Sequence, residues 1–280
     1  MYKIVKKREL NPTVTLMEVD APFVARKAEP GQFIILRVDE EGERIPLTVA
    51  DFDRKKGTVT IIFQIVGGTT ERLNHLSEGD FIQDFVGPLG EPSHTEGLKK
   101  VAVVGGGVGC AIAYPVAKKL HEQGAQVHSV VGFRNKDLVI LEEEFSAVSD
   151  VFKMMTDDGS YGEKGLVTDA LKALIEAGNE YDEVIAIGPV VMMKFVSLLT
   201  KQYGIKTVVS MNPIMIDGTG MCGCCRLTVA GKTRFACVDG PDFDGHEVDY
   251  DEILKRASTY KEFEAKEREK ACNLFKKEVR

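Results

Sequence analysis

The sequence predicts a small antiparallel β-barrel, then an α/β domain with a parallel sheet, then a cysteine-rich loop module and a charged helical tail. Three observations predict this order. Short β-branched and aromatic segments, separated by Gly, Pro and Asp, fill residues 1–98. Strand-like and helix-like patterns alternate over residues 99–212. Four of the six cysteines then fall within residues 213–246, before a charged stretch at 247–280.

The first domain is expected to be a barrel because its strand segments are short and almost nothing helical lies between them. One helix is predicted at "TTERLNHL" (69–76). The predicted strand segments lie at 13–22, 31–40, 44–53, 57–67 and 79–90.

The second domain starts at "KKVAVVGGGVG" (99–109), a buried strand that runs into glycines. Alternating strands and helices are typical of a parallel sheet with helices on both faces. Further strands are predicted at 126–133, 151–158, 183–189 and 206–212, and helices at 110–124, 142–148, 166–178 and 190–204.

Composition excludes several classes of protein. A net charge of −7 argues against a nucleic-acid-binding protein, because phosphate binding needs clustered Lys and Arg. The N-terminus "MYKIVKKREL" lacks the apolar region of a signal peptide, and no apolar run approaches the roughly 20 residues that cross a bilayer. We therefore expect a cytoplasmic protein without a membrane partner, in which clustered cysteines bind metal or carry redox chemistry.

A glycine loop joins the first strand and helix of the second domain. It consists of Gly105, Gly106, Gly107, Val108 and Gly109. Glycines there let the backbone approach a pyrophosphate, and the helix N-terminus favours negative charge. The G-x-G-x-x-G pattern is incomplete, because Cys110 stands at the third glycine position. The loop therefore predicts a nucleotide phosphate site, with a purely structural turn as the alternative.

No acidic residue ends the next strand, where one would bind a ribose, and the strand leads instead to "GFRNKD" (132–137). Two interpretations of Arg134 and Lys136 stay open. They lie near a 2′-phosphate, which would suit NADP, or they are solvated loop charges.

The cysteine loop "DGTGMCGCCR" (217–226) admits several metal sites. A Cys3His zinc site would use Cys222, Cys225, Cys237 and His246. A thioredoxin-like pair fits poorly, because the loop is rich in glycine and opens no helix.

A plant-type [2Fe–2S] loop reads C-x4-C-x2-C with a distant fourth cysteine. Cys222 and Cys225 supply the C-x2-C, and Cys237 follows after eleven intervening residues. Asp217 stands where the first cysteine belongs, and a carboxylate can ligate iron although it is harder than a thiolate. We predict these four as ligands and Cys224 as a small buried residue. Two alternatives to Asp217 as a ligand stay open: Cys224 in a distorted loop, or no fourth ligand from the protein.

Taken together, the order of barrel, nucleotide domain and iron–sulfur loop resembles the iron–sulfur members of the ferredoxin–NADP reductase superfamily. The resemblance covers residues 1 to about 240. Five segments carry it: "PGQFI" (30–34), "RIPLT" (44–48), "GGTTERL" (67–73), "GPLG" (87–90) and "IGPVVMMK" (187–194).

Within this superfamily, the aspartate at 217 and the long charged tail resemble one branch, the small subunit of NADH-dependent reduced ferredoxin:NADP oxidoreductase. That enzyme is an electron-bifurcating transhydrogenase, also described as sulfide dehydrogenase. The electron-transfer subunit of dihydroorotate dehydrogenase is the related alternative. It has cysteine at the first ligand position and ends nearer the last cysteine.

The resemblance implies that the barrel binds FAD. Arg44 is expected to neutralise the pyrophosphate, with the start of the following helix helping. Thr48 is expected to present its hydroxyl near flavin N5, where hydride arrives, and is the predicted catalytic residue. The implied FAD-binding residues are Arg44, Pro46, Leu47, Thr48, Gly68, Thr69 and Thr70.

The resemblance also implies that the second domain binds NAD(H). The glycine loop would hold the phosphates, and Gly188 and Pro189 would form the wall beside the nicotinamide ribose. Asp157 or Asp158, at the end of a strand, would contact a ribose or else cap the next turn. Arg134 completes the predicted set.

The implied function is that of an electron-transfer flavoprotein subunit. It would exchange hydride between NAD(H) and FAD and pass single electrons through the cluster to a larger flavoprotein subunit with [4Fe–4S] clusters. Ferredoxin would be reached only indirectly. An alternative of another class is a nucleotide-binding regulator whose zinc knuckle at 222–237 docks a partner.

Overall fold

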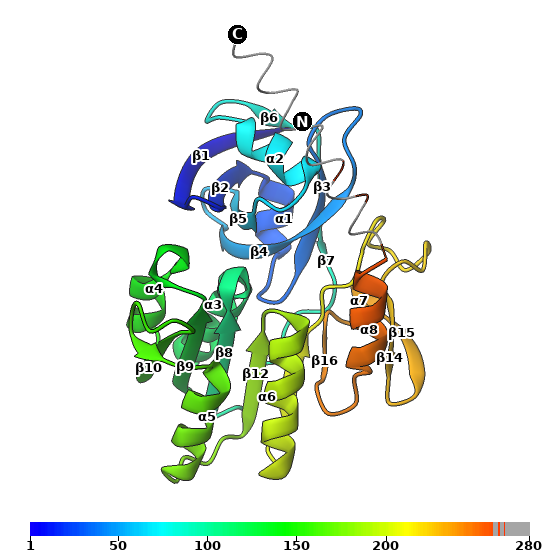
Figure 1. Cartoon of the computed structure of the whole chain (residues 1–280). Coiled ribbons are helices and arrows are strands. Elements are labelled where there is room, and N and C mark those ends of the chain that lie inside the picture. Colours follow the sequence, from blue (N-terminus) through cyan, green and yellow to red (C-terminus); the bar gives the residue numbers. More distant parts are fainter. Residues whose placement is uncertain (260–262, 264–265, 267–280) are drawn as a thin grey trace.

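The computed structural model describes residues 1–259, 263 and 266, and it divides into an upper barrel and a lower α/β layer (Figure 1). The barrel is a seven-stranded antiparallel sheet in the order β6-β1-β2-β5-β4-β3-β7. Its two end strands are consecutive in the chain, so the sheet curls into a nearly closed barrel. Its elements are β1 (Tyr2–Asn11), β2 (Val14–Asp20), α1 (Pro22–Lys27), β3 (Phe33–Arg37), β4 (Ile45–Asp53), β5 (Thr58–Gln64), α2 (Gly68–His75), β6 (Phe81–Ile82) and β7 (Asp84–Leu89).

The barrel core is apolar and closely packed. Ile4, Met17, Ile61, Phe63 and Phe85 are each at most 1% exposed. Burial of one such side chain contributes about 1.5–3 kcal/mol, so this core alone can support a separate domain. The predicted barrel strands and the helix at 69–76 are confirmed, whereas β1 and α1 were not predicted.

The second sheet has the order β11-β10-β9-β8-β12-β13-β16, parallel except for the antiparallel β16. All the strands and helices predicted for this domain are present, and the short β11 was not predicted. The elements of the domain are β8 (Lys100–Gly106), α3 (Cys110–Glu122), β9 (Gln126–Phe133), α4 (Glu142–Ala147), β10 (Val151–Thr156), the unpredicted β11 (Glu163–Lys164), α5 (Val167–Glu176), β12 (Glu183–Ile187), α6 (Val190–Gln202) and β13 (Thr207–Ser210).

The cysteine module is built onto the edge of this sheet. The chain leaves β13, forms the loop and a hairpin, and returns as β16 beside β13, where Val209 pairs with Phe243. The module is therefore anchored at both ends to the α/β domain. Its elements are β14 (Arg226–Val229), β15 (Lys232–Phe235), α7 (Ala236–Asp239) and β16 (Asp242–Asp244), and helix α8 (Tyr250–Ala257) follows it.

The start of the tail differs from the expectation of a helix that is solvated or packs on another chain. Helix α8 packs on its own chain, beside α6 and β14, and buries Tyr250 and Ile253. The remainder of the predicted helical tail lies outside the described residues, apart from positions 263 and 266. No helix within the described part of the chain is both long and apolar enough to span a membrane.

Candidate functional site

Strand β4 carries the segment predicted to bind flavin. Arg44 precedes the strand and is exposed, while Pro46, Leu47 and Thr48 are half-buried on it. Their register partners on β3 are Ile35, Ile34 and Phe33, respectively. Because a barrel strand alternates its side chains between core and exterior, this segment can present a row of groups to a ligand outside the barrel.

The start of α2 lies beside that segment. Thr69 donates a hydrogen bond to Glu43, the neighbour of Arg44, with 3.2 Å between Oγ1 and Oε2. The buried Thr70 hydroxyl accepts hydrogen bonds from the N–H groups of Val66 and Gly67, both at 3.0 Å. It thereby fixes the turn at Gly68. The helix start therefore lies beside the segment that carries Glu43 and Arg44.

The glycine loop forms the edge of the second sheet at the carboxyl ends of β8 and β12. A Cβ on Gly109 would lie 2.6 Å from both the Cα of Gly188 and the carbonyl oxygen of Ile187, so only glycine permits this contact. Gly106 lies against the side chains of Pro189 and Met192. Two predicted parts of the NAD site, far apart in the sequence, are therefore in direct contact.

Gly107 is the open point of this loop. Its φ of +54° favours glycine, and no other atom lies within 4 Å of the position of a Cβ. The backbone is accessible there, as approach to a phosphate requires. Gly105 packs on Cys110, the residue at the third glycine position, whose buried thiol fills the contact between strand and helix.

The remaining predicted NAD residues end the neighbouring strands. Arg134 follows β9 and is exposed, and Asp157 follows β10, where its N–H donates to the carbonyl of Phe133. Asp158 instead accepts a hydrogen bond from the N–H of Ser160 at 2.9 Å. Its contacts with Ser160 hold the pKa of Asp158 below its ordinary value. Asp158 therefore stabilises a turn, the alternative left open by the sequence.

The cysteine loop is organised around Asp217. Its two carboxylate oxygens accept hydrogen bonds from the N–H groups of Thr219 and Cys222, each at 2.9 Å. The hydrogen bond from Thr219, and then that from Cys222, lowers the pKa of Asp217 below its ordinary value. An ionised carboxylate with lone pairs to spare therefore faces the start of the C-x2-C pair.

Cys225 and Cys237 form the inner half of the predicted ligand set. Both are 1% exposed, and their sulfur atoms are 3.2 Å apart. Burial raises the pKa of the Cys237 thiol to about 12, and contact with Cys225 adds to the shift. The N–H of Gly220 counteracts it by bonding to this sulfur. Such a buried thiol pair carries a high cost for ionisation unless a metal neutralises it.

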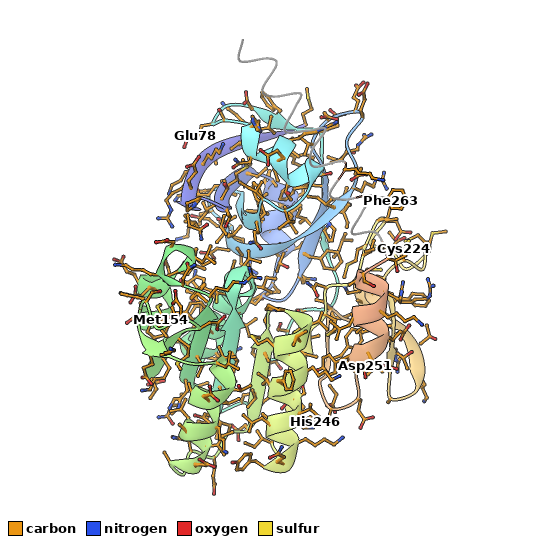
Figure 2. The ribbon with its side chains drawn as sticks, viewed as in Figure 1. Glu78, Met154, Cys224, His246, Asp251 and Phe263 are labelled. Atoms are coloured by element: carbon orange, nitrogen blue, oxygen red, sulfur yellow. The ribbon has the colours of Figure 1, made fainter. Side chains whose placement is uncertain are left out.

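The outer half is open. Cys222 is exposed. Cys224 is half-buried (Figure 2), not buried as predicted, and its sulfur makes a long contact of 4.0 Å with the Cys222 carbonyl. Among residues 1–259, no three His, Cys, Asp or Glu side chains are close enough together to hold a metal ion. Positive φ angles at Gly218, Gly220 and Gly223 nevertheless turn the loop around Cys237, and the donor set of thiols and one carboxylate suits iron.

The cluster loop packs on barrel strands β3 and β7, and β3 pairs with the predicted flavin segment on β4. Ile35 of β3 is the register partner of Pro46, and its Cγ1 would lie 3.1 Å from a Cβ on Gly218. Leu89 of β7 lies closer still, at 2.6 Å. One strand thus separates the predicted flavin segment from the loop that carries Asp217.

Comparison with known proteins agrees with this arrangement. Residues 103–198 match the oxidoreductase NAD-binding domain family, and residues 212–249 match the iron–sulfur cluster binding domain of dihydroorotate dehydrogenase B. A Thermotoga maritima homologue of the electron-transfer subunit of dihydroorotate dehydrogenase B (NAD(+)) is 49% identical over 264 residues, 94% of this chain and 93% of that protein. The Fusobacterium nucleatum electron-transfer subunit is 33% identical, covering 83% of this chain and 92% of its own.

The chain belongs to this family of electron-transfer subunits. A solved structure of the NADH-dependent reduced ferredoxin–NADP oxidoreductase contains a chain of 48% identity and TM-score 0.91, covering 96% of this chain and 97% of that one. As a member of the electron-transfer subunit family, the protein is an oxidoreductase subunit of the ferredoxin–NADP reductase type. FAD, NAD(H) and [2Fe–2S] are the cofactors of this type.

Two links between the domains were not predicted from the sequence. In the electron-transfer subunit, Lys118 of α3 pairs with Asp51 of β4, with 3.1 Å between Nζ and Oδ1. Ser93, on the connection between the domains, donates to Asp242 of β16 at 2.6 Å. No local pattern marks either pair, because each joins residues whose proximity depends on packing of the whole chain.

Proposed function

We propose that the chain exchanges hydride between NAD(H) and FAD and passes single electrons through a [2Fe–2S] cluster to a larger iron–sulfur flavoprotein subunit. One observation carries the proposal. Ile35 pairs with Pro46 of the predicted flavin segment, and its side chain packs on Gly218 of the cluster loop. We assign FAD to residues 1–98, NAD(H) to 99–212 and the cluster to 213–246, with 247–280 as the tail.

In this proposal, the barrel orients the flavin. Arg44 and the first turn of α2, from Gly68 to Thr70, bind the pyrophosphate, while Pro46, Leu47 and Thr48 line the isoalloxazine. The Thr48 hydroxyl hydrogen-bonds near N5. Support comes from the hydrogen bond of Thr69 to Glu43, which holds the helix start beside the Arg44 segment.

The carboxyl edge of the second sheet binds the dinucleotide. The loop from Gly105 to Gly109 approaches the phosphates, and Gly188 with Pro189 shapes the nicotinamide side. Arg134 and Asp157, exposed at the next two strand ends, contact the adenosine part. The ion pair between Lys118 and Asp51 supports the juxtaposition of this edge and the barrel.

The cluster ligands in this proposal are Asp217, Cys222, Cys225 and Cys237. Bound FAD supplies the conversion between two-electron hydride chemistry and one-electron transfer, which no side chain can perform. The chain contributes position: the inner cysteines are buried, the outer part of the loop is exposed, and the barrel lies behind it. An exposed outer face is where a partner subunit can receive single electrons.

The proposed partner is a larger flavoprotein subunit with [4Fe–4S] clusters, through which ferredoxin and NADP are reached in electron bifurcation. The similarity to a chain of NADH-dependent reduced ferredoxin–NADP oxidoreductase supports this choice. The electron-transfer subunit of an NAD-dependent dihydroorotate dehydrogenase is the second candidate, favoured by the 33% identity to the F. nucleatum subunit.

Purification of the chain alone, and together with a candidate large subunit, tests the proposal. The isolated chain should show flavin and iron–sulfur absorption and should oxidise NADH with ferricyanide. Ferredoxin-dependent NADP reduction should need the large subunit, and if the isolated chain performs it unaided, the subunit assignment is wrong. A partner that oxidises dihydroorotate supports the second candidate. A colourless, zinc-containing chain overturns both.

A further inference from the structure

Helix α8 is attached to the hairpin that follows the cluster loop. Val248, just before the helix, forms an antiparallel bridge with Val229 of β14. The N–H of Asp249 donates to the carbonyl of Thr228 at 2.9 Å, and Glu252 accepts from the N–H of Thr228 at 3.0 Å. The helix is thus held in a defined register against β14.

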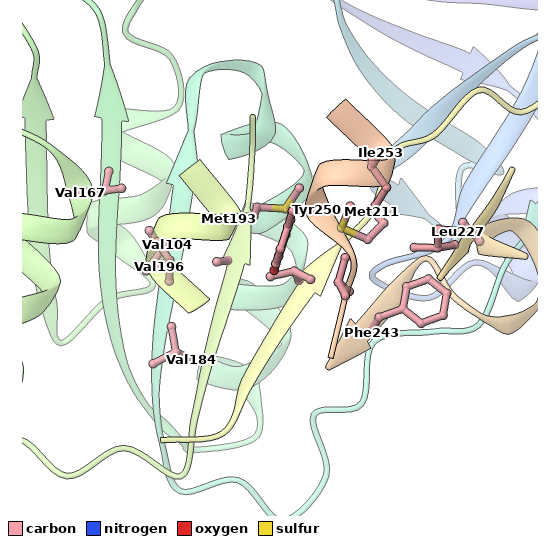
Figure 3. Packing of buried hydrophobic residues seen from close by; sticks show 14 of the residues in the cluster. Val104, Val167, Val184, Met193, Val196, Met211, Leu227, Phe243, Tyr250 and Ile253 are labelled. Atoms are coloured by element: carbon pink, nitrogen blue, oxygen red, sulfur yellow. The ribbon is translucent and has the colours of Figure 1, made fainter. Parts of the chain in front are cut away.

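The same helix is attached to α6 of the nucleotide domain. Tyr250 and Ser197 share a buried hydrogen bond of 2.8 Å, and Lys194 pairs with Asp251 at 2.7 Å. Tyr250 and Ile253 lie in the same buried cluster as Met193 and Met211 (Figure 3). Because both attachments constrain α8, the side chains of its last turn are held at a fixed place relative to the cluster loop.

Arg256 lies in that last turn and reaches the cysteine loop. Its guanidinium donates to the carbonyl oxygen of Cys224 at 2.8 Å and also to that of Arg226. These two carbonyls flank Cys225, the buried predicted ligand. A rigid planar fork that binds the residues on both sides of Cys225 fixes its backbone, and it places a permanent positive charge beside the loop.

We propose that Arg256 is a positioning residue that holds Cys225 in place and raises the reduction potential of the [2Fe–2S] cluster. The inference rests on the proposed function for the existence of the cluster. Reduction adds one negative charge to a centre already surrounded by thiolates and the Asp217 carboxylate. A nearby guanidinium favours the reduced form, because cluster potentials follow net charge and hydrogen bonding.

Three variants separate the effect of the two guanidinium hydrogen bonds from the effect of the positive charge. Arg256→Gln removes both, and Arg256→Lys keeps the charge but loses the two-pronged contact. Lys255→Gln removes one positive charge from the adjacent, exposed position of the same helix without touching the loop. EPR-monitored redox titration of the full chain should give a more negative cluster potential for Arg256→Gln, a smaller shift for Arg256→Lys and none for Lys255→Gln.

A second readout does not need the cluster. Amide hydrogen exchange in residues 217–226 of the apo chain should accelerate in Arg256→Gln and Arg256→Lys, but not in Lys255→Gln. Unchanged exchange in both Arg256 variants overturns the proposal that Arg256 holds the backbone at Cys225 in place. Equal potential shifts in Arg256→Gln and Lys255→Gln overturn the specific role of the fork. If the wild-type chain holds no [2Fe–2S] cluster, the proposed function fails, whereas the exchange experiment still tests whether Arg256 holds the cysteine loop in place.

Discussion

The sulfur atoms of Cys225 and Cys237 lie 3.2 Å apart, and both side chains are 1% exposed. The pair joins the end of the C-x2-C motif to the distant fourth position. The buried thiols lie against Leu227 and Ala236 in one apolar cluster, where an unneutralised charge is costly. The fold therefore brings together two of the four proposed ligands, as one metal centre would require.

Replacement of Cys237 by Ser should abolish the cluster and leave FAD bound. A hydroxyl is a poor iron ligand, and the main core cluster of the barrel contains none of the residues of the cysteine module. Iron content and flavin content of the purified variant measure the two effects. Cys224→Ala is the matched control and should retain the cluster. Loss of iron in Cys224→Ala with retention in Cys237→Ser would reverse the ligand assignment.

Replacement of Asp217 by Cys should retain a [2Fe–2S] centre whose potential and EPR spectrum differ from those of the wild type. A thiolate is softer than a carboxylate and changes the electron density at the iron. Asp217→Asn should lose or weaken the cluster, although its side-chain oxygen can still accept a loop N–H. EPR spectra identical to wild type in both variants would show that Asp217 stabilises the loop and is no ligand.

Gly109→Ala should weaken NADH binding strongly. The new methyl group would lie 2.6 Å from the Cα of Gly188, and because both neighbours are backbone, the two loops must separate. Displacements of this size at a positioned substrate cost up to about 100-fold in rate. Steady-state kinetics with NADH and ferricyanide measure the change in KM and kcat.

Gly124→Ala controls for stability in the Gly109 experiment. Gly124 has a φ of +82° and open space around it at the end of α3, so an alanine there costs about 1 kcal/mol without touching the site. Its melting temperature should fall while KM stays unchanged. A normal KM in Gly109→Ala would contradict the proposed phosphate loop.

Arg44→Gln should weaken FAD binding. A hydrogen bond to a charged group contributes about 1.5–3 kcal/mol, which corresponds to roughly 10- to 100-fold in affinity. Fluorescence titration of the apo chain with FAD gives the dissociation constant. Arg54→Gln removes an arginine paired with Glu29 at 2.6 Å, outside the flavin segment, and should leave FAD affinity unchanged. Equal losses in the two variants would indicate a general effect of charge.

Much of the fold could be predicted because local patterns specify it. Alternation of strand and helix patterns from residue 99 onward predicts the parallel sheet, and the predicted strands and helices are present, whereas β11 and the antiparallel β16 were not predicted. The missed elements have weak local signals. Strand β1 is rich in Lys and Arg, and α1 has only six residues, so neither shows the apolar periodicity on which such predictions depend.

The site was predicted in part for the same reason. The glycine loop, Gly188 and the cysteines belong to short motifs, and the structure brings Gly109 to Gly188 and Cys225 to Cys237. The pairing of Asp51 with Lys118 and the reach of Arg256 to Cys224 belong to no motif. Their partners are distant in the sequence and come together only when the domains pack.

The sequence by itself determined the order of the parts: barrel, glycine loop, cysteine loop and charged tail. It did so because turn residues, periodicity and ligand spacing act over a few neighbouring positions. Only the tertiary structure decided that Gly218 packs on Ile35 of β3, the strand paired with the flavin segment, that β16 returns to the sheet, and that α8 clamps the cysteine loop. These contacts follow from burial of complementary surfaces, which no local pattern encodes.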